Sequence, residues 1–171
     1  IGSRLVGSEM CIRDSAKTAS LFSAACQVGS ISALGTEAEI NALKSFGTNF
    51  GMTFQLIDDA IDYSSNKKIL GKNTGDDFKE GKITLPIILA YGRSNDKEKK
   101  FWERTISDLN QNDGDFEMAL EIINKYQCIE DTLTRANHFS NVAVDSVDIF
   151  KDNIYKEKLV SLVSKSVSRI Y

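Results

Sequence analysis

Three aspartates, Asp58, Asp59 and Asp62, close the mostly apolar segment "FQLIDDAID" at residues 54–62. The C-terminus of a helix carries partial negative charge, so a carboxylate there costs stability, typically about 0.3–1 kcal/mol. No lysine or arginine lies between Lys44 and Lys67 to offset these charges. The segment therefore places negative charge where a helix on its own disfavours it.

The spacing of these aspartates is suited to binding a hard metal ion. Positions three and four apart share a helix face, so Asp58 and Asp62 are neighbours one turn apart with Asp59 beside them, and Gln55 lies one turn earlier. Carboxylates this close repel one another unless they are protonated or neutralised. Mg²⁺ prefers oxygen ligands and commonly binds through one or two carboxylates plus a substrate phosphate. The DDxxD pattern thus indicates half of a metal–diphosphate site, although a solvated acidic helix end is the commoner meaning of this motif alone.

The segment that follows, "SSNKKILGKNTGDDFKEGKI" at residues 64–83, strengthens the diphosphate hypothesis. It contains three glycines and five lysines, a composition typical of a loop. Connections of this length tend to be functional or disordered. The point charges of Lys72 and Lys82 suit phosphate oxygens. Aspartates followed by a glycine- and lysine-rich loop favour phosphate chemistry over a plain surface turn.

The rest of the chain predicts an all-α protein. It has a single proline in 171 residues and regular apolar spacing, both of which favour helices. Thr36 and Glu39 form a capping-box pattern at the start of a long helix, and Pro86 suits the first turn of another. The expected helices span about 17–29, 37–63, 84–92, 95–110, 114–126, 128–150 and 153–170.

Composition and charge exclude several classes of function. The net charge of −3 gives no general electrostatic reason to bind nucleic acid or an anionic membrane surface. Three scattered cysteines and one histidine support neither zinc, haem nor a disulfide framework, and reduced thiols in a cytosol are the simplest interpretation. No apolar run of about 18 residues occurs, so no membrane span is predicted. We therefore expect a cytoplasmic protein.

The first fifteen residues, "IGSRLVGSEMCIRDS", do not match the pattern of the remainder. They lack a clean helical period and the apolar core of a signal peptide, and they resemble translated adapter sequence. We expect residues 1–15 to be non-native and residues 16–171 to be one helical domain that lacks its natural N-terminal part.

The motifs together resemble one enzyme family. "FGMTFQLIDDAIDY" followed by "LGKNTGDDFKEGKITLPIILAY" is similar to the second aspartate-rich region of the trans-type polyprenyl diphosphate synthases, and "KTASLFSAAC" at residues 17–26 resembles their Lys-Thr helix. This resemblance implies an antiparallel helical bundle of the isoprenoid synthase type, here incomplete. The loop is most similar to bacterial octaprenyl and decaprenyl synthases, which make quinone side chains.

The resemblance also implies roles for individual residues. Asp58, Asp59 and Asp62 match the DDxxD that binds Mg²⁺, with Asp58 expected to be the strongest ligand. Further residues match groups that bind the substrate diphosphate: Lys17, Thr18, Gln55, Lys72 and Lys82. Among the catalytic groups we count Asp58, Asp59, Lys17 and Lys72, while Asp77 is expected to have a structural or supporting role.

The function implied is a prenyltransferase that extends an allylic diphosphate with isopentenyl diphosphate, as a homodimer. The family needs two aspartate-rich motifs on facing helices, and this sequence contains one. We therefore expect the chain to be the C-terminal half of a synthase, inactive or nearly so alone. Two alternatives stay open: a non-catalytic helical subunit that partners a synthase, and a class I terpene cyclase. The Lys72–Lys82 loop argues against the cyclase.

Overall fold

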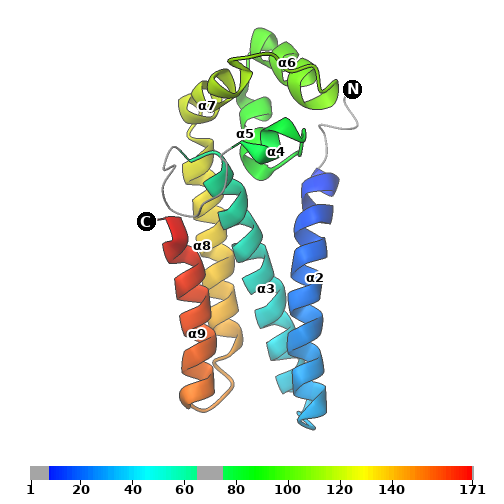
Figure 1. The fold of residues 1–171 in the computed structure, drawn as a ribbon. Coiled ribbons are helices and arrows are strands. Elements are labelled where there is room, and N and C mark those ends of the chain that lie inside the picture. Colours follow the sequence, from blue (N-terminus) through cyan, green and yellow to red (C-terminus); the bar gives the residue numbers. More distant parts are fainter. Residues whose placement is uncertain (1–7, 65–74, 171) are drawn as a thin grey trace. The chain divides into compact units, whose positions relative to one another are not determined.

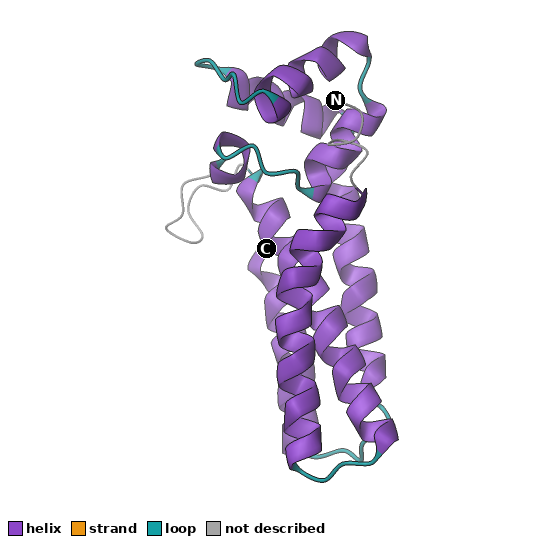
Figure 2. Ribbon diagram, turned by 90° about the vertical axis from the view of Figure 1, so that its right-hand side faces the viewer, coloured by secondary structure: helices purple, strands orange, loops and turns teal. Residues whose placement is uncertain are grey.

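The computed structural model describes residues 8–64 and 75–170, with the backbone alone for residues 8–17 and 170. Helices make up the regular structure of these residues and no strand occurs among them (Figures 1 and 2), which confirms the all-α prediction. The chain divides into two compact units. We call Ile1–Ile12 with Asp58–Leu133 the aspartate unit, and Arg13–Ile57 with Thr134–Tyr171 the bundle unit.

The structure describes the following helices in chain order. Their bounds are α2 Ser8–Ser32, α3 Glu37–Asp62, α4 Asp76–Lys79, α5 Leu85–Arg93, α6 Asp96–Trp102, the π-helical η1 Glu103–Ser107, α7 Asp115–Lys125, α8 Cys128–Ser146, α9 Ile154–Val167 and the 3₁₀ segment η2 Ser168–Ile170.

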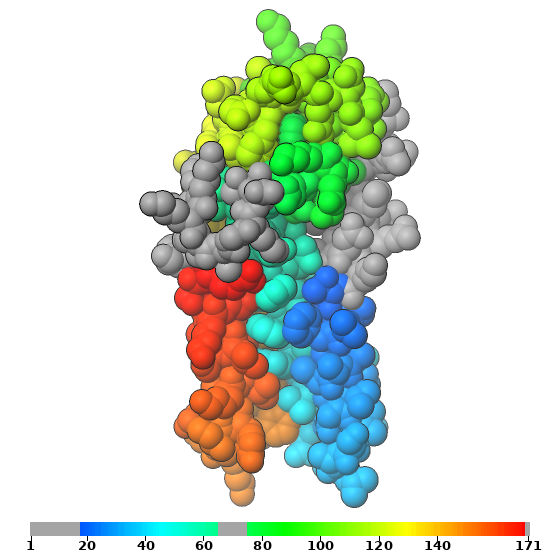
Figure 3. Space-filling view, viewed as in Figure 1, coloured from blue at the N-terminus to red at the C-terminus, as the bar shows by residue number. Residues whose placement is uncertain are grey.

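The bundle unit packs long helices around a small apolar core. The buried members of this core are Phe46 of α3, Ala143 of α8, Val147 just after α8, and Val163 of α9. Cys26 of α2 packs against them. A hydrogen bond between the hydroxyls of Ser45 and Ser146, 2.8 Å apart, joins α3 to α8. On the face shown in Figure 3, α9, α3 and α2 succeed one another across the unit.

Two glycines bring α2 and α3 into close contact in the bundle unit. A Cβ atom on Gly47 would lie 2.5 Å from the carbonyl oxygen of Phe22, and one on Gly51 would lie 2.6 Å from the Cα of Ala19. Real Cβ atoms do not approach other atoms this closely, so only glycine fits at these positions. The small side chains permit backbone-to-backbone packing of the two helices.

The aspartate unit has a larger core, built around Trp102. This ring is fully buried among apolar side chains that include Phe78, Ile87 and Ile123. Its indole nitrogen donates to the hydroxyl of Ser94 at 3.1 Å, which satisfies the polar atom of an otherwise apolar side chain. Trp102 thus lies within the core of this unit.

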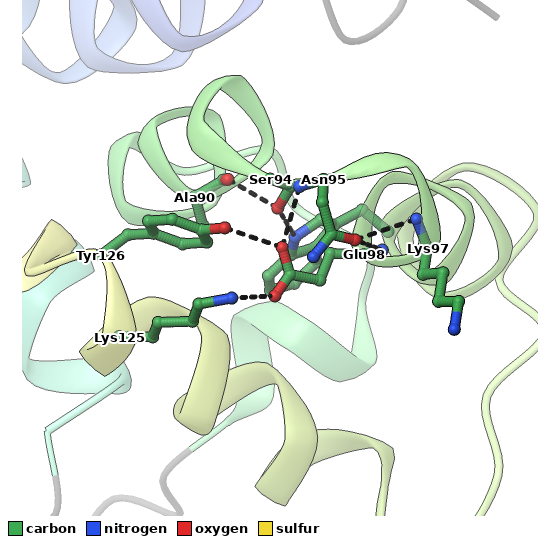
Figure 4. A network of polar contacts seen from close by, with 8 residues as sticks. Ala90, Ser94, Asn95, Lys97, Glu98, Lys125 and Tyr126 are labelled. Atoms are coloured by element: carbon green, nitrogen blue, oxygen red, sulfur yellow. Dashed lines mark hydrogen bonds and ion pairs between the residues drawn. The ribbon is translucent and has the colours of Figure 1, made fainter.

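The turn between α5 and α6 is fixed by a polar network (Figure 4). The side chain of Asn95 accepts hydrogen bonds from the backbone amides of Lys97 and Glu98, and Glu98 accepts from the Asn95 amide, which makes a complete capping box. Glu98 also accepts from Lys125 at 2.7 Å and from the Tyr126 hydroxyl at 2.9 Å. One carboxylate therefore ties the start of α6 to the end of α7.

Several boundaries differ from those the sequence predicts. The first helix begins at Ser8 rather than Lys17, because Glu9, Met10 and Arg13 are good helix formers and extending an existing helix costs little. The predicted loop 64–83 contains α4, and the predicted helix 95–110 changes to π-helix after Trp102. The capping box of Thr36 and Glu39 is present as predicted.

Two further expectations can be compared with the described residues. Within 8–64 and 75–170, no helix is both long and apolar enough to cross a membrane. Cys26 and Cys128 are free thiols, and burial raises the pKa of each.

Candidate functional site

The three aspartates of the DDxxD lie in the last two turns of α3, but in different surroundings. Asp59 is buried, at 3% relative exposure, whereas Asp58 and Asp62 are half-buried. Among the residues that the structure describes, no group of three or more His, Cys, Asp or Glu side chains is gathered to hold a metal. Magnesium commonly uses only one or two carboxylates and completes its shell with water and phosphate oxygens, which is compatible with this finding.

Asp62 contacts the segment that follows the loop. Its Oδ2 accepts a hydrogen bond from the Asp77 backbone amide at 3.0 Å, and its backbone carbonyl accepts from the Gly75 amide at 3.0 Å. The end of α3 is thereby joined to the first residues of α4, thirteen to fifteen positions later. Asp62 accordingly serves as an N-terminal cap for a helix to which it does not itself belong.

The surroundings of Asp62 act in opposite directions on its proton affinity. Partial burial raises the pKa of the Asp62 carboxyl, and the negative charge of Asp77 adds to that effect. Hydrogen bonds from the backbone amides of residues 75–77 favour the ionised form and partly counter the increase. The net effect is a raised pKa.

Lys82 is positioned by acidic neighbours on the same segment. Its Nζ lies 2.8 Å from Asp77 Oδ1 and 2.9 Å from Glu80 Oε2, and both hydrogen bonds raise the pKa of the lysine. The Asp77 side chain is 17% exposed whereas that of Lys82 is 51% exposed. The Lys82 side chain is therefore positively charged and accessible to solvent, and Asp77 fixes the position of its ammonium group. The supporting role of Asp77 stays a prediction.

In the bundle unit, two of the predicted substrate-binding residues contact each other. Thr18 Oγ1 of α2 donates to Gln55 Oε1 of α3 at 3.1 Å. The contact lies one helical turn beyond Gly51, one of the two glycines at which α2 and α3 approach closely. Lys17 precedes Thr18 on α2, but its side chain lies outside the described residues, as does all of Lys72.

Sequence patterns did not reveal the residues that support α4. Gly75 has a left-handed φ of 87°, and a Cβ there would lie 2.7 Å from the Phe116 ring. Gln111 Nε2 donates to the Phe78 carbonyl at 2.8 Å. The glycine before "DD" was a usable signal for a helix start, since glycine is accepted at N-caps. Nothing in the sequence pointed to Gln111 or Phe116.

Comparison with known proteins identifies the family. A family model described as "Polyprenyl synthetase" matches residues 12–123, which include the DDxxD and the whole GDDFKEGK segment. The chain belongs to the polyprenyl synthetase family. The prediction made from the two motifs is confirmed, and so is the isoprenoid synthase fold that it implied.

The relatives of this chain include synthases of long prenyl chains. Octaprenyl diphosphate synthase of Haemophilus influenzae is 38% identical over 155 residues, which cover 91% of this chain and 47% of that protein. The crystal structure of a decaprenyl diphosphate synthase from Rhodobacter capsulatus matches with a TM-score of 0.85 and 36% identity, over 92% of this chain and 48% of that one. The chain therefore spans about half the length of these relatives.

A third relative was solved with ligands. The structure of polyprenyl synthase from Caulobacter crescentus CB15, complexed with calcium and isoprenyl diphosphate, is 43% identical and has a TM-score of 0.83. The match covers 90% of this chain and 47% of that one. Calcium and isoprenyl diphosphate are thus bound by one member of the family to which this chain belongs.

Proposed function

We propose that this chain is part of a prenyltransferase that extends an allylic diphosphate with isopentenyl diphosphate to a long-chain polyprenyl diphosphate, a precursor of quinone side chains. The observation that carries the proposal is the hydrogen bond between Asp62 and the Asp77 amide. It joins the DDxxD to the GDDFKEGK segment, in a chain whose relatives include octaprenyl and decaprenyl diphosphate synthases. On the resemblance we further infer a cytoplasmic homodimer.

The metal would be held by the acidic end of α3. Asp58 is the main proposed ligand because it is half-buried, whereas Asp59 is nearly inaccessible. Carboxylate oxygens are the donors that Mg²⁺ prefers, so the chemistry of the residues present fits this ion. When bound, Mg²⁺ would neutralise the negative charge of the diphosphate leaving group. That Asp59 and Asp62 also contribute to metal binding stays a prediction from the DDxxD motif.

The remaining charge on the diphosphate would be offset by polar and basic side chains. In the aspartate unit, the exposed ammonium of Lys82 is available to phosphate oxygens, with Asp77 fixing its approach. Lys72 is proposed for the same role on the resemblance alone. In the bundle unit, Thr18 and Gln55 hold each other by a hydrogen bond, and Lys17 precedes them on α2.

The proposed reaction requires no protein nucleophile. The allylic C–O bond breaks and its electron pair leaves with the diphosphate, whose developing charge the basic side chains stabilise. The double bond of isopentenyl diphosphate supplies the electrons for the new C–C bond. A proton is then lost from the adjacent carbon to the released diphosphate, which restores a double bond. The protein binds, orients and excludes water.

Substitution of Asp58 in the complete protein tests the proposal. Asp58→Ala should lower turnover by more than about 100-fold, because the diphosphate would leave without its metal partner. Asp113→Asn removes a carboxylate from an exposed loop position and serves as the control. Product formation from labelled isopentenyl diphosphate is the measurement. Near-normal turnover of Asp58→Ala would refute the ligand assignment.

A further inference from the structure

Helix α4 cannot be stable by itself. It has four residues, and its N-cap, Gly75, offers no side chain to accept from the exposed amides. Helices shorter than about 12 residues are marginal in water even with good sequences. The carboxylate of Asp62 supplies the missing acceptor, through the hydrogen bond to the Asp77 amide.

Contacts on the other side of the segment hold it against the aspartate unit. Phe78 is buried at 2% exposure and its ring centroid lies 5.7 Å from that of Phe116. Gln111 donates to the Phe78 carbonyl, and Gly81 adopts a φ of 64° against the side chain of Leu109. The segment is therefore anchored at its start by Asp62, in its middle by Phe78 and at its end by Gly81.

This anchoring determines where Lys82 is presented. Asp77 uses its amide to bind Asp62, its carbonyl to accept from the Lys82 amide at 2.9 Å, and its carboxylate to bind Lys82 Nζ. A displacement of Asp77 would move both the backbone and the ammonium group of Lys82. Asp62, Asp77 and Lys82 thus form one connected chain of contacts.

We propose that Asp62 is a positioning residue that holds α4, and through Asp77 sets the place of Lys82, rather than acting mainly as a metal ligand. The proposal rests on the proposed function, in which Lys82 faces an anionic diphosphate. It separates two roles within the DDxxD: Asp58 binds the cation, and Asp62 joins the acidic helix end to the basic segment. The two carboxylates, one turn apart, should respond differently to the same substitution.

Asparagine distinguishes the two roles because its amide oxygen still accepts from a backbone amide but carries no charge. In the complete protein, Asp62→Asn should leave the Mg²⁺ concentration for half-maximal turnover within about twofold of its original value, whereas Asp58→Asn should raise it at least about tenfold. Asp62→Ala should raise the KM for the allylic diphosphate more than it lowers kcat. If Asp62→Asn shifts the Mg²⁺ requirement as far as Asp58→Asn does, the proposal is wrong.

Hydrogen exchange provides a measurement independent of activity. Exchange of the Asp77 amide should accelerate at least about tenfold in Asp62→Ala and by less in Asp62→Asn, because hydrogen bonds to charged acceptors are the stronger ones. Unchanged exchange in Asp62→Ala would show that Asp62 anchors nothing. If Asp58→Asn leaves the Mg²⁺ requirement unchanged, the proposed function is contradicted. The hydrogen-exchange result would still report whether Asp62 anchors α4.

A second variant covers the case in which Asp62→Ala does not fold. Gln111→Ala weakens the same segment from its other side without touching an aspartate. It should raise the KM for the allylic diphosphate and leave the Mg²⁺ requirement unchanged. An unaltered KM would show that the position of the segment is irrelevant to binding, contrary to the proposal.

Discussion

Gly51 of α3 packs directly against Ala19 of α2, so closely that a Cβ on the glycine would lie 2.6 Å from the Ala19 Cα. The close approach occurs one turn before Gln55, whose side chain accepts from Thr18. Packing and the polar contact are therefore parts of the same helix–helix interface. The separation of the two backbones fixes whether Thr18 reaches Gln55.

Gly51→Ala should force α2 and α3 apart. The nearest atom is backbone, which cannot rotate away as a side chain can, so the overpacking should destabilise the protein by about 1–3 kcal/mol. The Thr18–Gln55 hydrogen bond should be lost as well. Urea unfolding followed by circular dichroism measures the first effect.

Gly29→Ala is the matched control for that substitution. Gly29 lies within α2, and a Cβ there meets nothing within 4 Å. The same chemical change should therefore be neutral or stabilising by up to about 1 kcal/mol, through helix propensity alone. Equal effects of the two substitutions would contradict the close packing at Gly51.

The capping network of α6 provides a second stability prediction. Asn95→Ala removes the acceptor for the amides of Lys97 and Glu98 and should cost about 1 kcal/mol. Asn41→Ala makes the same change at an exposed position inside α3, where alanine is the better helix former, and should not destabilise. Thermal unfolding of both variants is the measurement, and a larger loss for Asn41→Ala would be inconsistent with the network.

The pair of Arg104 and Asp115 predicts how stability depends on pH. Two hydrogen bonds, of 2.7 and 2.8 Å, join the guanidinium to the carboxylate and hold the pKa of Asp115 below its ordinary value. A carboxyl whose pKa is lower in the folded state contributes stability above its unfolded pKa of about 3.9, and that contribution disappears as the pH falls through the folded pKa.

Asp115→Asn should therefore flatten the acid limb of the stability curve. Between about pH 5 and pH 2, the free energy of unfolding should fall less steeply in this variant than in the unsubstituted chain. Arg104→Gln should flatten it too, because the group that lowers the pKa of Asp115 is gone. Parallel curves for all three proteins would show that the ion pair does not contribute.

Local signals in the sequence were sufficient for much of the fold. The Thr36–Glu39 capping box and the apolar repeat of 37–63 depend on residues within a few positions of one another, and both are confirmed. The hydrogen bond between Asp62 and the Asp77 amide joins residues fifteen positions apart. It forms only because the start of α4 lies against the end of α3, and no local sequence pattern predicts that arrangement. The ion pair of Arg104, in the π-helical η1, with Asp115 eleven residues later is likewise a contact that no local pattern encodes.

The candidate site, like the fold, could be predicted where it depends on neighbouring residues in the sequence and not where it depends on tertiary packing. The residue types and their helical spacing identified the DDxxD and its basic partner segment, because charge placement is visible in a sequence. The different environments of the three aspartates could not be predicted from the sequence. Burial of Asp59 and capping of α4 by Asp62 depend on tertiary packing.

The 171-residue chain itself should not elongate prenyl chains. It contains a single aspartate-rich motif, and the family resemblance implies that two are needed to hold both the metal ions and the diphosphate. Incubation with Mg²⁺, farnesyl diphosphate and labelled isopentenyl diphosphate should therefore yield no long product, while full-length octaprenyl diphosphate synthase of Haemophilus influenzae, assayed in parallel, reports that the conditions support elongation. Efficient elongation by the chain alone would mean that one motif suffices, and the roles assigned to Asp58 and Lys82 would then have to account for the entire charge of the leaving group.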